Sequence, residues 1–330
     1  MKIRSGILLL GAAFWLLAVT AGCQPTYPRT KIKESIIRVC KSEYKIDVKV
    51  VAIGKTIAIY LPLPDLLDYT FAITKAAGEK INNVILSVSR VALSTDAQFD
   101  FYVIIAHDVR LPEIQIVIIK SVDDVKRLLL NDISRGEYSN RMLVDIRMNP
   151  QAQKEHSIKE VFDKMNLDKK WQDQVMNDFF RSEPTGLGDI GYWNGRFYVK
   201  DISMAEFLAE QVANRVKIEF RDDKKLAESL ILKSSKGVYR PRARNRYFQF
   251  EVLAEPKSTE QQNSGKAART VFQLVLKTAS GVIHSYNFSD FGYIEVVNLL
   301  DGQKLRVSRD EMEAFRKNKM KIDDILLKTI

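Results

Sequence analysis

Two short runs, FDFYVIIA (Phe99–Ala106) and EIQIVIIK (Glu113–Lys120), decide the fold of this chain. Both are rich in the β-branched and aromatic residues that favour strands. Their apolar stretches are continuous rather than alternating, which predicts strands that are buried on both faces. The runs flank a short loop, His107–Pro112. They therefore predict two neighbouring strands in a sheet that is covered on both sides.

The segments around these strands complete a first unit over residues 31–147. Gly54-Lys55 is a two-residue loop with glycine first, as a type II′ hairpin requires. Ser121 and Asp124 have the spacing of a capping box, which begins a helix. Apolar periodicity and turn residues place the other elements. The expected order is a helix over Lys31–Tyr44, strands over Asp47–Ile53 and Thr56–Leu61, a helix over Asp68–Val91, the two strands quoted above and a helix from Ser121, with the strands forming an antiparallel sheet.

Residues 148–202 are predicted to form a helical connector that ends in a small hairpin. Gln151–Arg181 is polar and helical in pattern, and Ser157 with Glu160 has capping-box spacing. An apolar stripe within it repeats every four residues, which is typical of a helix face docked on a core. The stripe consists of Trp171, Val175 and Phe179, with Met176 and Phe180 beside it.

A second unit is expected over residues 203–330. Its first helix, Met204–Arg215, follows Ser203 and Glu206 in capping-box spacing. Asp301-Gly302 is the strongest hairpin signal in the chain. The remaining β-prone runs predict a second antiparallel sheet. These runs are Val216–Phe220, Tyr247–Leu253, Thr270–Thr278, Val282–Phe288, Tyr293–Leu299 and Lys304–Val307, and Ser308 with Glu311 caps a last helix.

The predicted fold class is therefore α+β, with two antiparallel-sheet units and their packed helices joined by a helical connector. Both units open with a helix followed by strands, which suggests an internal duplication, although no motif repeats residue for residue. The chain has 46% apolar and 28% charged residues, a composition typical of globular rather than disordered proteins.

The first residues of the chain predict export. Lys2 and Arg4 precede an unbroken apolar run, Ile7–Val19, and small residues follow it. A basic head, an apolar run of about 7–15 residues and small residues before a cut describe a secretory signal peptide. The run is short for a membrane-spanning helix, which needs about 20 apolar residues.

Ala21-Gly22-Cys23 resembles the lipobox of bacterial lipoproteins. The resemblance implies that residues 1–22 are a signal peptide cut between Gly22 and Cys23, that the Cys23 thiol carries diacylglycerol and that its new amine is acylated. That family favours leucine three residues before the cysteine, where this chain has Thr20. An uncleaved anchor helix that ends near Pro25 and an ordinary cleaved signal are the two alternatives.

The same resemblance bears on location. An aspartate after the cysteine tends to hold such lipoproteins in the inner membrane, so Gln24 implies the outer membrane, facing the periplasm, in a cell with two membranes. Residues 23–30 contain Pro25 and Pro28 and are predicted to form an extended tether. With Cys23 lipidated, Cys40 has no intrachain partner, and its apolar helix face predicts a buried thiol.

No catalytic or cofactor motif stands out from the sequence. Gly186–Gly191 matches the dinucleotide pattern G-x-G-x-x-G, but it neither follows a predicted strand nor opens a helix. His107, His156 and His284 form no metal-ligand pattern with the cysteines. There is no G-x-S-x-G elbow, and no acid–base pair of carboxylates can be identified. We therefore expect no cofactor, no metal and no enzymatic activity.

A small aromatic hairpin is predicted around Asn194-Gly195. Its aromatic side chains alternate between two faces, so one pair could be exposed and contact a sugar or a protein. Packing of the same side chains onto the neighbouring helix is the alternative. The residues are Tyr192, Trp193, Phe197 and Tyr198.

A basic row over residues 233–246 is the clearest electrostatic feature. The segment contains no acidic residue, and its arginines are spaced by two, so in an extended strand they point to the same side. Such a row could bind phospholipid headgroups, an anionic envelope polymer or an acidic protein face. Nucleic acid is not expected outside the cytoplasm. The alternative is a solvated edge strand whose charges prevent edge pairing. The cations are Lys233, Lys236, Arg240, Arg242, Arg244 and Arg246.

Together these features predict a lipid-anchored cell-envelope protein with a non-catalytic binding or scaffolding role at the membrane surface. The expected partners are membrane lipid, through acylated Cys23, and an anionic polymer, headgroups or an envelope protein. Two alternatives remain open: an envelope hydrolase with an unrecognised acid–base pair, and a subunit of an envelope assembly or transport complex.

Overall fold

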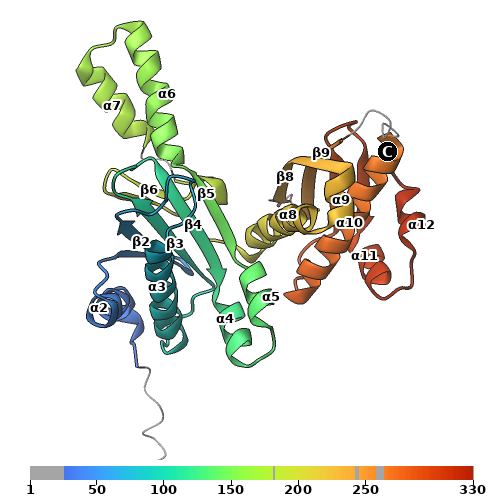
Figure 1. The fold of residues 1–330 in the computed structure, drawn as a ribbon, viewed down its shortest axis with the longest axis horizontal. Helices are drawn as coiled ribbons and strands as arrows, with labels where there is room; N and C mark the ends of the chain where they lie inside the picture. The colour runs from blue at the N-terminus through green and yellow to red at the C-terminus, as the bar shows by residue number, and fades with distance from the viewer. Residues whose placement is uncertain (1–25, 181–182, 242–244, 258–263, 330) are drawn as a thin grey trace, which may run out of the picture.

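The computed structural model describes residues 26–180, 183–241, 245–257 and 264–329. These residues form eleven α-helices, a five-stranded sheet, a four-stranded sheet and a two-stranded hairpin. Figure 1 shows two sheet-containing units, and a pair of helices that projects from the first of them. The predicted α+β class is confirmed.

The first unit is built on the five-stranded sheet, whose order follows the chain. All neighbouring strands are antiparallel except β2 and β3, which are parallel. Parallel neighbours need a crossover connection, and helix α3 supplies it, so the prediction of a purely antiparallel sheet is wrong. The strands are β1 (Lys49–Ile53), β2 (Thr56–Leu63), β3 (Phe101–Asp108), β4 (Ile114–Ser121) and β5 (Leu143–Met148).

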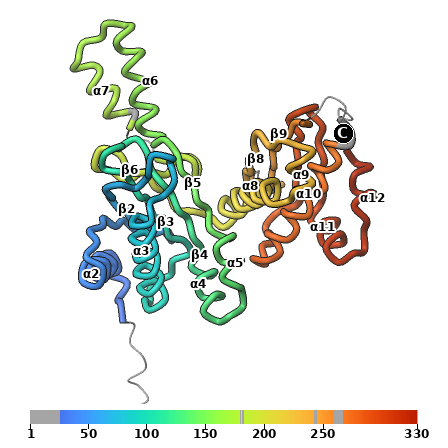
Figure 2. The backbone as a smooth tube through the Cα atoms, viewed as in Figure 1, coloured from blue at the N-terminus to red at the C-terminus, as the bar shows by residue number. Residues whose placement is uncertain are grey.

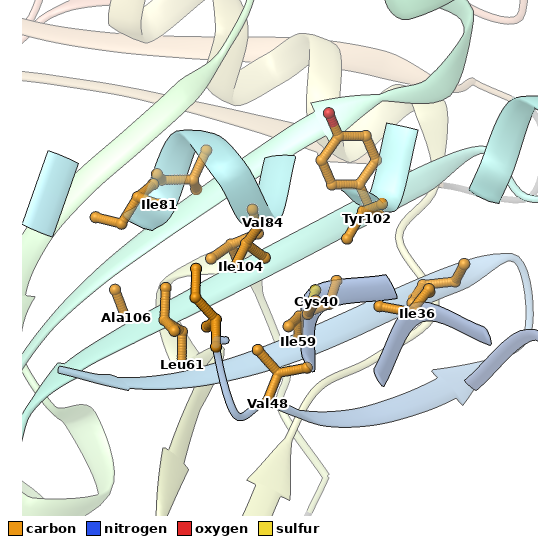
Figure 3. Packing of buried hydrophobic residues seen from close by; sticks show 14 of the residues in the cluster. Ile36, Cys40, Val48, Ile59, Leu61, Ile81, Val84, Tyr102, Ile104 and Ala106 are labelled. Carbon is orange, nitrogen blue, oxygen red and sulfur yellow. The ribbon is translucent and has the colours of Figure 1, made fainter. Parts of the chain in front are cut away.

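Helices cover one face of this sheet. Figure 3 shows side chains from α2 and α3, such as Cys40, converging on side chains from β2 and β3, such as Ile104. Cys40 and Ile104 are both fully buried. Helix α3 begins after Thr74, whose side chain accepts a hydrogen bond from the backbone N–H of Ala77, rather than at Asp68 as predicted. The helices of this unit are η1 (Arg29–Lys31), α2 (Ile32–Tyr44), α3 (Lys75–Leu93), α4 (Val122–Leu129) and α5 (Arg135–Asn140).

The opposite face of the sheet is covered too, as the apolar runs predict. Val103 and Ile105 of β3 are fully buried there against Ile190, Tyr192 and Phe207. These covering residues come from the connector and from the start of the second unit. The connector includes a short turn η2 (Leu187–Asp189) and the hairpin strands β6 (Gly191–Trp193) and β7 (Arg196–Tyr198).

The rest of the connector is a pair of helices, α6 (Pro150–Met165) and α7 (Lys169–Phe179). They run as a hairpin that stands away from the body of the first unit (Figures 1 and 2). The side chain of Asn149 accepts hydrogen bonds from the backbone at the start of α6. Ser157 therefore lies inside the helix, and its predicted capping role is wrong.

The second unit contains the four-stranded sheet, with helices α8 and α10 packed on one face. The capping boxes predicted at Ser203 and Ser308 are both present. Strands β9 and β10 are parallel and the other neighbours are antiparallel. The elements are α8 (Met204–Asp222), α9 (Lys224–Ser229), β8 (Leu230–Arg240), β9 (Tyr247–Pro256), α10 (Ser264–Ser285), β10 (Tyr293–Asn298), β11 (Lys304–Ser308), α11 (Arg309–Arg316) and α12 (Ile322–Leu326).

Three predicted strands of this unit are wrong. Val216–Phe220 is the last part of α8, where Val216 and Phe220 are buried one helical turn apart. Thr270–Thr278 and most of Val282–Phe288 belong to the single helix α10. Because α10 connects β9 to β10, it creates the parallel pair that the sequence analysis did not expect.

The two units share one arrangement of elements. In each unit the chain forms a helix, two antiparallel strands, a crossover helix and two further antiparallel strands. The order of these strands in the sheet is their order in the chain, and the two strands joined by the crossover helix are parallel neighbours. The first series is α2, β1, β2, α3, β3 and β4, and the second is α8, β8, β9, α10, β10 and β11, with α9 inserted. The shared order agrees with the suggested internal duplication, which stays a prediction.

The predicted signal peptide and its cleavage site, Gly22 and Cys23, lie outside the described residues. None of the helices in the described part of the chain has the length and apolar character of a membrane span.

Candidate functional site

The basic row lies at an edge of the second sheet. Its first residues belong to β8, which among the described strands pairs only with β9. Several of its cations have partners: Lys233 pairs with Glu255 at 3.3 Å, and Arg246 pairs with Asp290. The Arg240 Nε donates a hydrogen bond to Gln249.

Arg242 and Arg244 lie outside the described residues, so the structure does not describe the full row. Lys236 and Arg240 are both exposed on β8, four register positions apart on the same face, with Val238 between them. Their exposure suits either interpretation of the sequence, a charged edge strand or a surface for anions. Binding of anions by the row stays a prediction.

The aromatic hairpin β6–β7 is packed against the first sheet. Tyr192 stacks on Tyr60 with ring centroids 3.7 Å apart, and Lys49 donates a hydrogen bond to its hydroxyl at 2.8 Å. Tyr192 and Tyr198 are buried, whereas Trp193 and Phe197 are half-buried. The hairpin thus presents no fully exposed aromatic pair, and the expected contact with a sugar or protein stays a prediction.

Glu155 fixes this hairpin to α6. Its carboxylate accepts hydrogen bonds from the Trp193 indole N–H at 2.6 Å and from Lys159 at 2.5 Å. Burial raises the pKa of Glu155, but these hydrogen bonds outweigh burial and lower the pKa below its usual range. A charged Glu155 therefore ties the base of the α6–α7 hairpin to β6.

A buried polar cluster joins the two units. Asp124 of α4 accepts hydrogen bonds from Arg141 at 2.8 Å and from the hydroxyl of Tyr286, which follows α10, at 2.5 Å. Arg141 also donates to Glu137 and lies over the Tyr286 ring. Glu137 in turn pairs with Arg215 of α8. Sequence reasoning missed this cluster and assigned Asp124 to a capping box instead.

Lys120 is an unusual member of the same region. Its side chain is buried, and its ammonium lies 3.7 Å from the centre of the Tyr138 ring. Burial lowers the pKa of Lys120 to about 7, although the nearby Asp124 carboxylate opposes the shift. An enzyme could use such a lysine as a base. Its burial among aromatic side chains instead indicates a structural group.

A cleft of about 210 Å³ opens beside this cluster, between α5, α8 and α10. Its polar lining includes Arg215, Glu219 and Lys277. The cleft lies at the junction of the two units.

The histidines occupy separate positions. His107, next to the Tyr60 ring, is buried, and burial lowers its pKa while Asp108 partly offsets the effect. His156 contacts Glu113 at 2.8 Å on the surface. Within the described ranges, no three His, Cys, Asp or Glu side chains are grouped closely enough to hold a metal ion.

The α6–α7 hairpin carries a surface that the sequence analysis placed in the core. Trp171 is 60% exposed and Met165 is 61% exposed, and Val161 and Val175 are exposed as well. The predicted docking of the Trp171–Val175 stripe is therefore wrong. Phe162 is buried on α6, and Gln172 and Met176, one turn apart, are half-buried on α7, so these sides of the two helices face each other.

Helical geometry places the four exposed side chains on one face. With 100° per residue, Val161 and Met165 lie on the same side of Phe162, and Trp171 and Val175 lie on the corresponding side of Gln172. Because the helices run in opposite directions, equal rotations bring both pairs to the same face of the hairpin. We call these four residues the hairpin apolar face.

In comparisons with known proteins, no family model, curated protein or solved structure matches this chain.

Proposed function

We propose that this chain is a lipid-anchored cell-envelope protein with a non-catalytic binding or scaffolding role. The observation that carries the proposal is the hairpin apolar face, which is exposed on an element that stands away from both sheet cores. Apolar side chains clustered on an exposed surface are typical of contact sites for other molecules. A helix pair that served only to complete a core would bury them.

Lipidation of Cys23 supplies membrane attachment in this proposal. Tyr27 is already buried, and its N–H donates a hydrogen bond to the Ser94 carbonyl at 3.2 Å. The fold therefore begins a few residues after Cys23, and the predicted tether is shorter than residues 23–30. A lipidated Cys23 would hold the first unit close to the membrane surface.

The expected partner of the hairpin is an envelope protein. The polar positions of α6 and α7 carry both lysines and acids, such as Lys159 and Glu160 or Lys169 and Asp173. A bilayer of anionic lipid favours an apolar face whose neighbouring polar residues are uniformly basic. An apolar face that contains a tryptophan and is bordered by both lysines and acids is more typical of a protein contact.

Mass spectrometry of the protein purified from membranes tests the anchor. We expect an acylated N-terminal cysteine at position 23, and Cys23→Ser should leave an unprocessed precursor. Cys40→Ala is the matched control and should be processed normally. Recovery of a native chain that begins at Met1 would contradict the anchor.

Crosslinking in intact cells, with the anchor in place, tests the contact surface. The parent should give discrete heavier species, and Trp171→Lys combined with Met165→Lys should remove them while leaving the thermal midpoint unchanged. Leu130→Lys is the control, because Leu130 is exposed on the first unit but distant in sequence from the hairpin. Crosslinked species that persist in the double variant would reject the hairpin as the contact surface, and their absence from the parent would reject the scaffolding role.

The exposed cations of β8 favour anionic headgroups as a second contact. Each cation near an anionic surface contributes about 1 kcal/mol, and the effect falls off within a Debye length of about 8 Å at physiological salt. Residues 30–330 should bind anionic liposomes weakly at low salt and release them as salt rises. Changing Arg240, Arg242, Arg244 and Arg246 to Gln should abolish binding. If this variant binds as well as the parent, the charges serve only to prevent pairing at the sheet edge.

A further inference from the structure

The cleft between α5, α8 and α10 is lined by two side chains that each hold a buried polar atom without a hydrogen-bond partner. Gln211 is 0% exposed and donates its amide N–H to the Asn140 carbonyl at 2.8 Å, but within the described residues nothing donates to its Oε1. Arg215 donates to Glu137 through Nη2 at 2.7 Å, but the same residues offer no acceptor to its Nε–H. Buried polar groups nearly always have partners, so these two atoms need an explanation.

The two unpartnered atoms come from one face of α8. Gln211 and Arg215 are four residues apart, and such residues are neighbours on a helix surface, with about 5–6 Å between their Cβ atoms. One atom is an acceptor and the other carries a donor N–H. A ligand that satisfies both must therefore carry a donor and an acceptor close to each other. A water molecule takes up about 30 Å³ of the liquid, so a cleft of about 210 Å³ has room for a small molecule.

Two charged side chains of the cleft also lack partners. Lys277 of α10 and Glu219 of α8 line the cleft and are exposed, and across the described ranges neither takes part in an ion pair or a hydrogen bond. In contrast, the charge of Arg141 is satisfied by Asp124 and Glu137, so it does not define a ligand. One free cation and one free anion are complementary to a small molecule that carries both charges.

Gly281 leaves the α10 side of the cleft open. It lies inside α10, where glycine is less favourable than alanine. A glycine within a regular element often permits close packing, as Gly237 does in β8, where an added Cβ would overlap the Ala209 backbone. At Gly281 an added Cβ would meet no neighbouring side chain or element within 4 Å. Close packing therefore does not explain Gly281, and the space beside it belongs to the cleft.

We propose that this cleft binds a free amino acid. The ligand carboxylate accepts a hydrogen bond from the Arg215 Nε and pairs with Lys277. The ligand ammonium donates to the Gln211 Oε1 and pairs with Glu219. An amino acid carries both groups on one carbon, which suits a donor and an acceptor that are one helical turn apart. The inference goes beyond the binding role proposed above and depends on neither the lipid anchor nor the hairpin apolar face.

The size and the apolar lining of the cleft favour an aliphatic amino acid. Drug-sized ligands occupy pockets of about 300–1,000 Å³, and this cleft is smaller. Leu274 and Val282 of α10 line it and are half-buried, so they offer an apolar contact to a branched side chain. Because both unpartnered atoms are covered in the empty cleft, rotation of their side chains accompanies binding, as is common at binding surfaces.

L-leucine is the probe, and two analogues of it lack one charge each. The full-length chain should bind L-leucine saturably in isothermal titration calorimetry. Isoamylamine lacks the carboxylate and isocaproate lacks the ammonium, so each leaves charged groups of the cleft unpaired and should bind at least about tenfold more weakly. Absence of leucine binding would overturn the proposal. Binding of either analogue as tight as that of leucine would overturn the assignment of a zwitterion to the cleft.

Variants locate the site. Lys277→Met should weaken leucine binding at least about tenfold, because it removes the free cation. Lys217→Met is the matched control, since Lys217 is exposed on α8 but does not line this cleft, and it should bind like the parent. Gly281→Leu places a side chain in the cleft and should abolish binding without lowering the thermal midpoint.

Gln273→Leu is the control for Gly281→Leu, because it places the same side chain at an exposed position of α10 outside the cleft. It should bind leucine like the parent. Full binding by the folded Gly281→Leu variant would reject the cleft as the site. If Gly281→Leu fails to fold, unchanged binding by Lys277→Met, a substitution at an exposed position, would reject it instead.

Discussion

The hydroxyl of Tyr286 donates a 2.5 Å hydrogen bond to the Asp124 carboxylate, which joins residues 162 positions apart in the chain and thereby the two units. Asp124 is 2% exposed, so its charge depends on the donors that surround it. Burial raises the pKa of Asp124, while the hydrogen bonds from Tyr286 and Arg141 oppose that effect. The contact therefore couples the charge of a buried group in the first unit to the position of α10 in the second.

Tyr286→Phe should weaken this coupling. It removes one donor from a buried carboxylate, a loss that costs about 1–3 kcal/mol. We expect a lower free energy of unfolding by calorimetry or denaturant, and faster hydrogen exchange at the end of α10. Tyr239→Phe is the control: it removes a hydrogen bond to the Asp290 carbonyl within the second unit, and it should cost less because that bond is exposed. Equal losses in the two variants would contradict a special role for the junction.

Lys120 predicts a pH dependence of stability. Its pKa is lowered by burial from 10.5 to about 7 in the folded chain. Between these values the unfolded chain binds more protons than the folded chain, so this group makes stability rise with pH, by at most about 1.4 kcal/mol per pH unit. Below pH 7 the folded chain must bury the charged ammonium of Lys120, and the resulting loss in the free energy of unfolding is then greatest.

Lys120→Met removes that cost while keeping the length of the side chain. The variant should be more stable than the parent at pH 6, and the difference should shrink as the pH approaches 10. Denaturant unfolding at several pH values measures it. Lys126→Met, at an exposed position of α4, should follow the parent at every pH. A parent and a Lys120→Met variant with parallel pH profiles would argue against the lowered pKa.

Local patterns predicted strands β1 to β4 of the first sheet well because these strands depend on local composition, whereas strand β5 was not predicted. The continuous runs of β3 and β4 have burial on both faces, and Gly54 takes the positive φ that a two-residue turn needs. The parallel contact between β2 and β3 was missed because it depends on the path of α3 across the sheet, not on either strand. An explicit test of which connections cross the sheet would have found it.

Helix α10 shows where composition misleads. Its segment is rich in Val, Phe, Leu and Thr, which favour strands, and Ser280-Gly281 suggests a turn. The segment nevertheless forms a helix, because its buried positions recur with a helical period and lie along one stripe that packs in the core. The stripe consists of Ala268, Val271, Phe272, Val275, Leu276, Ala279 and Ile283.

The candidate surfaces were only partly predictable for a similar reason. A repeat such as Trp171 and Val175 has the same pattern whether it faces a core or a partner, and only the position of the α6–α7 hairpin separates the two cases. The cluster around Asp124 joins residues from α4, α5 and the end of α10, and no sequence spacing records that meeting.

Cys40 should be unreactive in the folded chain. It is fully buried in α2, and burial raises the pKa of its thiol, which leaves little thiolate to react. A thiol reagent should label it only as the protein unfolds. Ile37→Cys is the matched control, because Ile37 lies on the exposed side of the same helix and should be labelled at once. Labelling of native Cys40 at the rate of that control would contradict the packing of α2.

Gly54→Ala should destabilise the contact between the first hairpin and the segment that leads into α8. Gly54 has φ +55°, and an added Cβ would overlap the Asp201 carboxylate. That carboxylate accepts a hydrogen bond from the Lys55 N–H at 2.8 Å, so its displacement breaks a link between segments 146 residues apart. Gly195→Ala separates the two effects, because Gly195 also has a positive φ, +81°, but open space around it. Backbone strain alone costs about 1–3 kcal/mol at either site. We therefore expect Gly54→Ala to lower the free energy of unfolding by more than Gly195→Ala does, and equal effects would mean that Asp201 moves aside without loss.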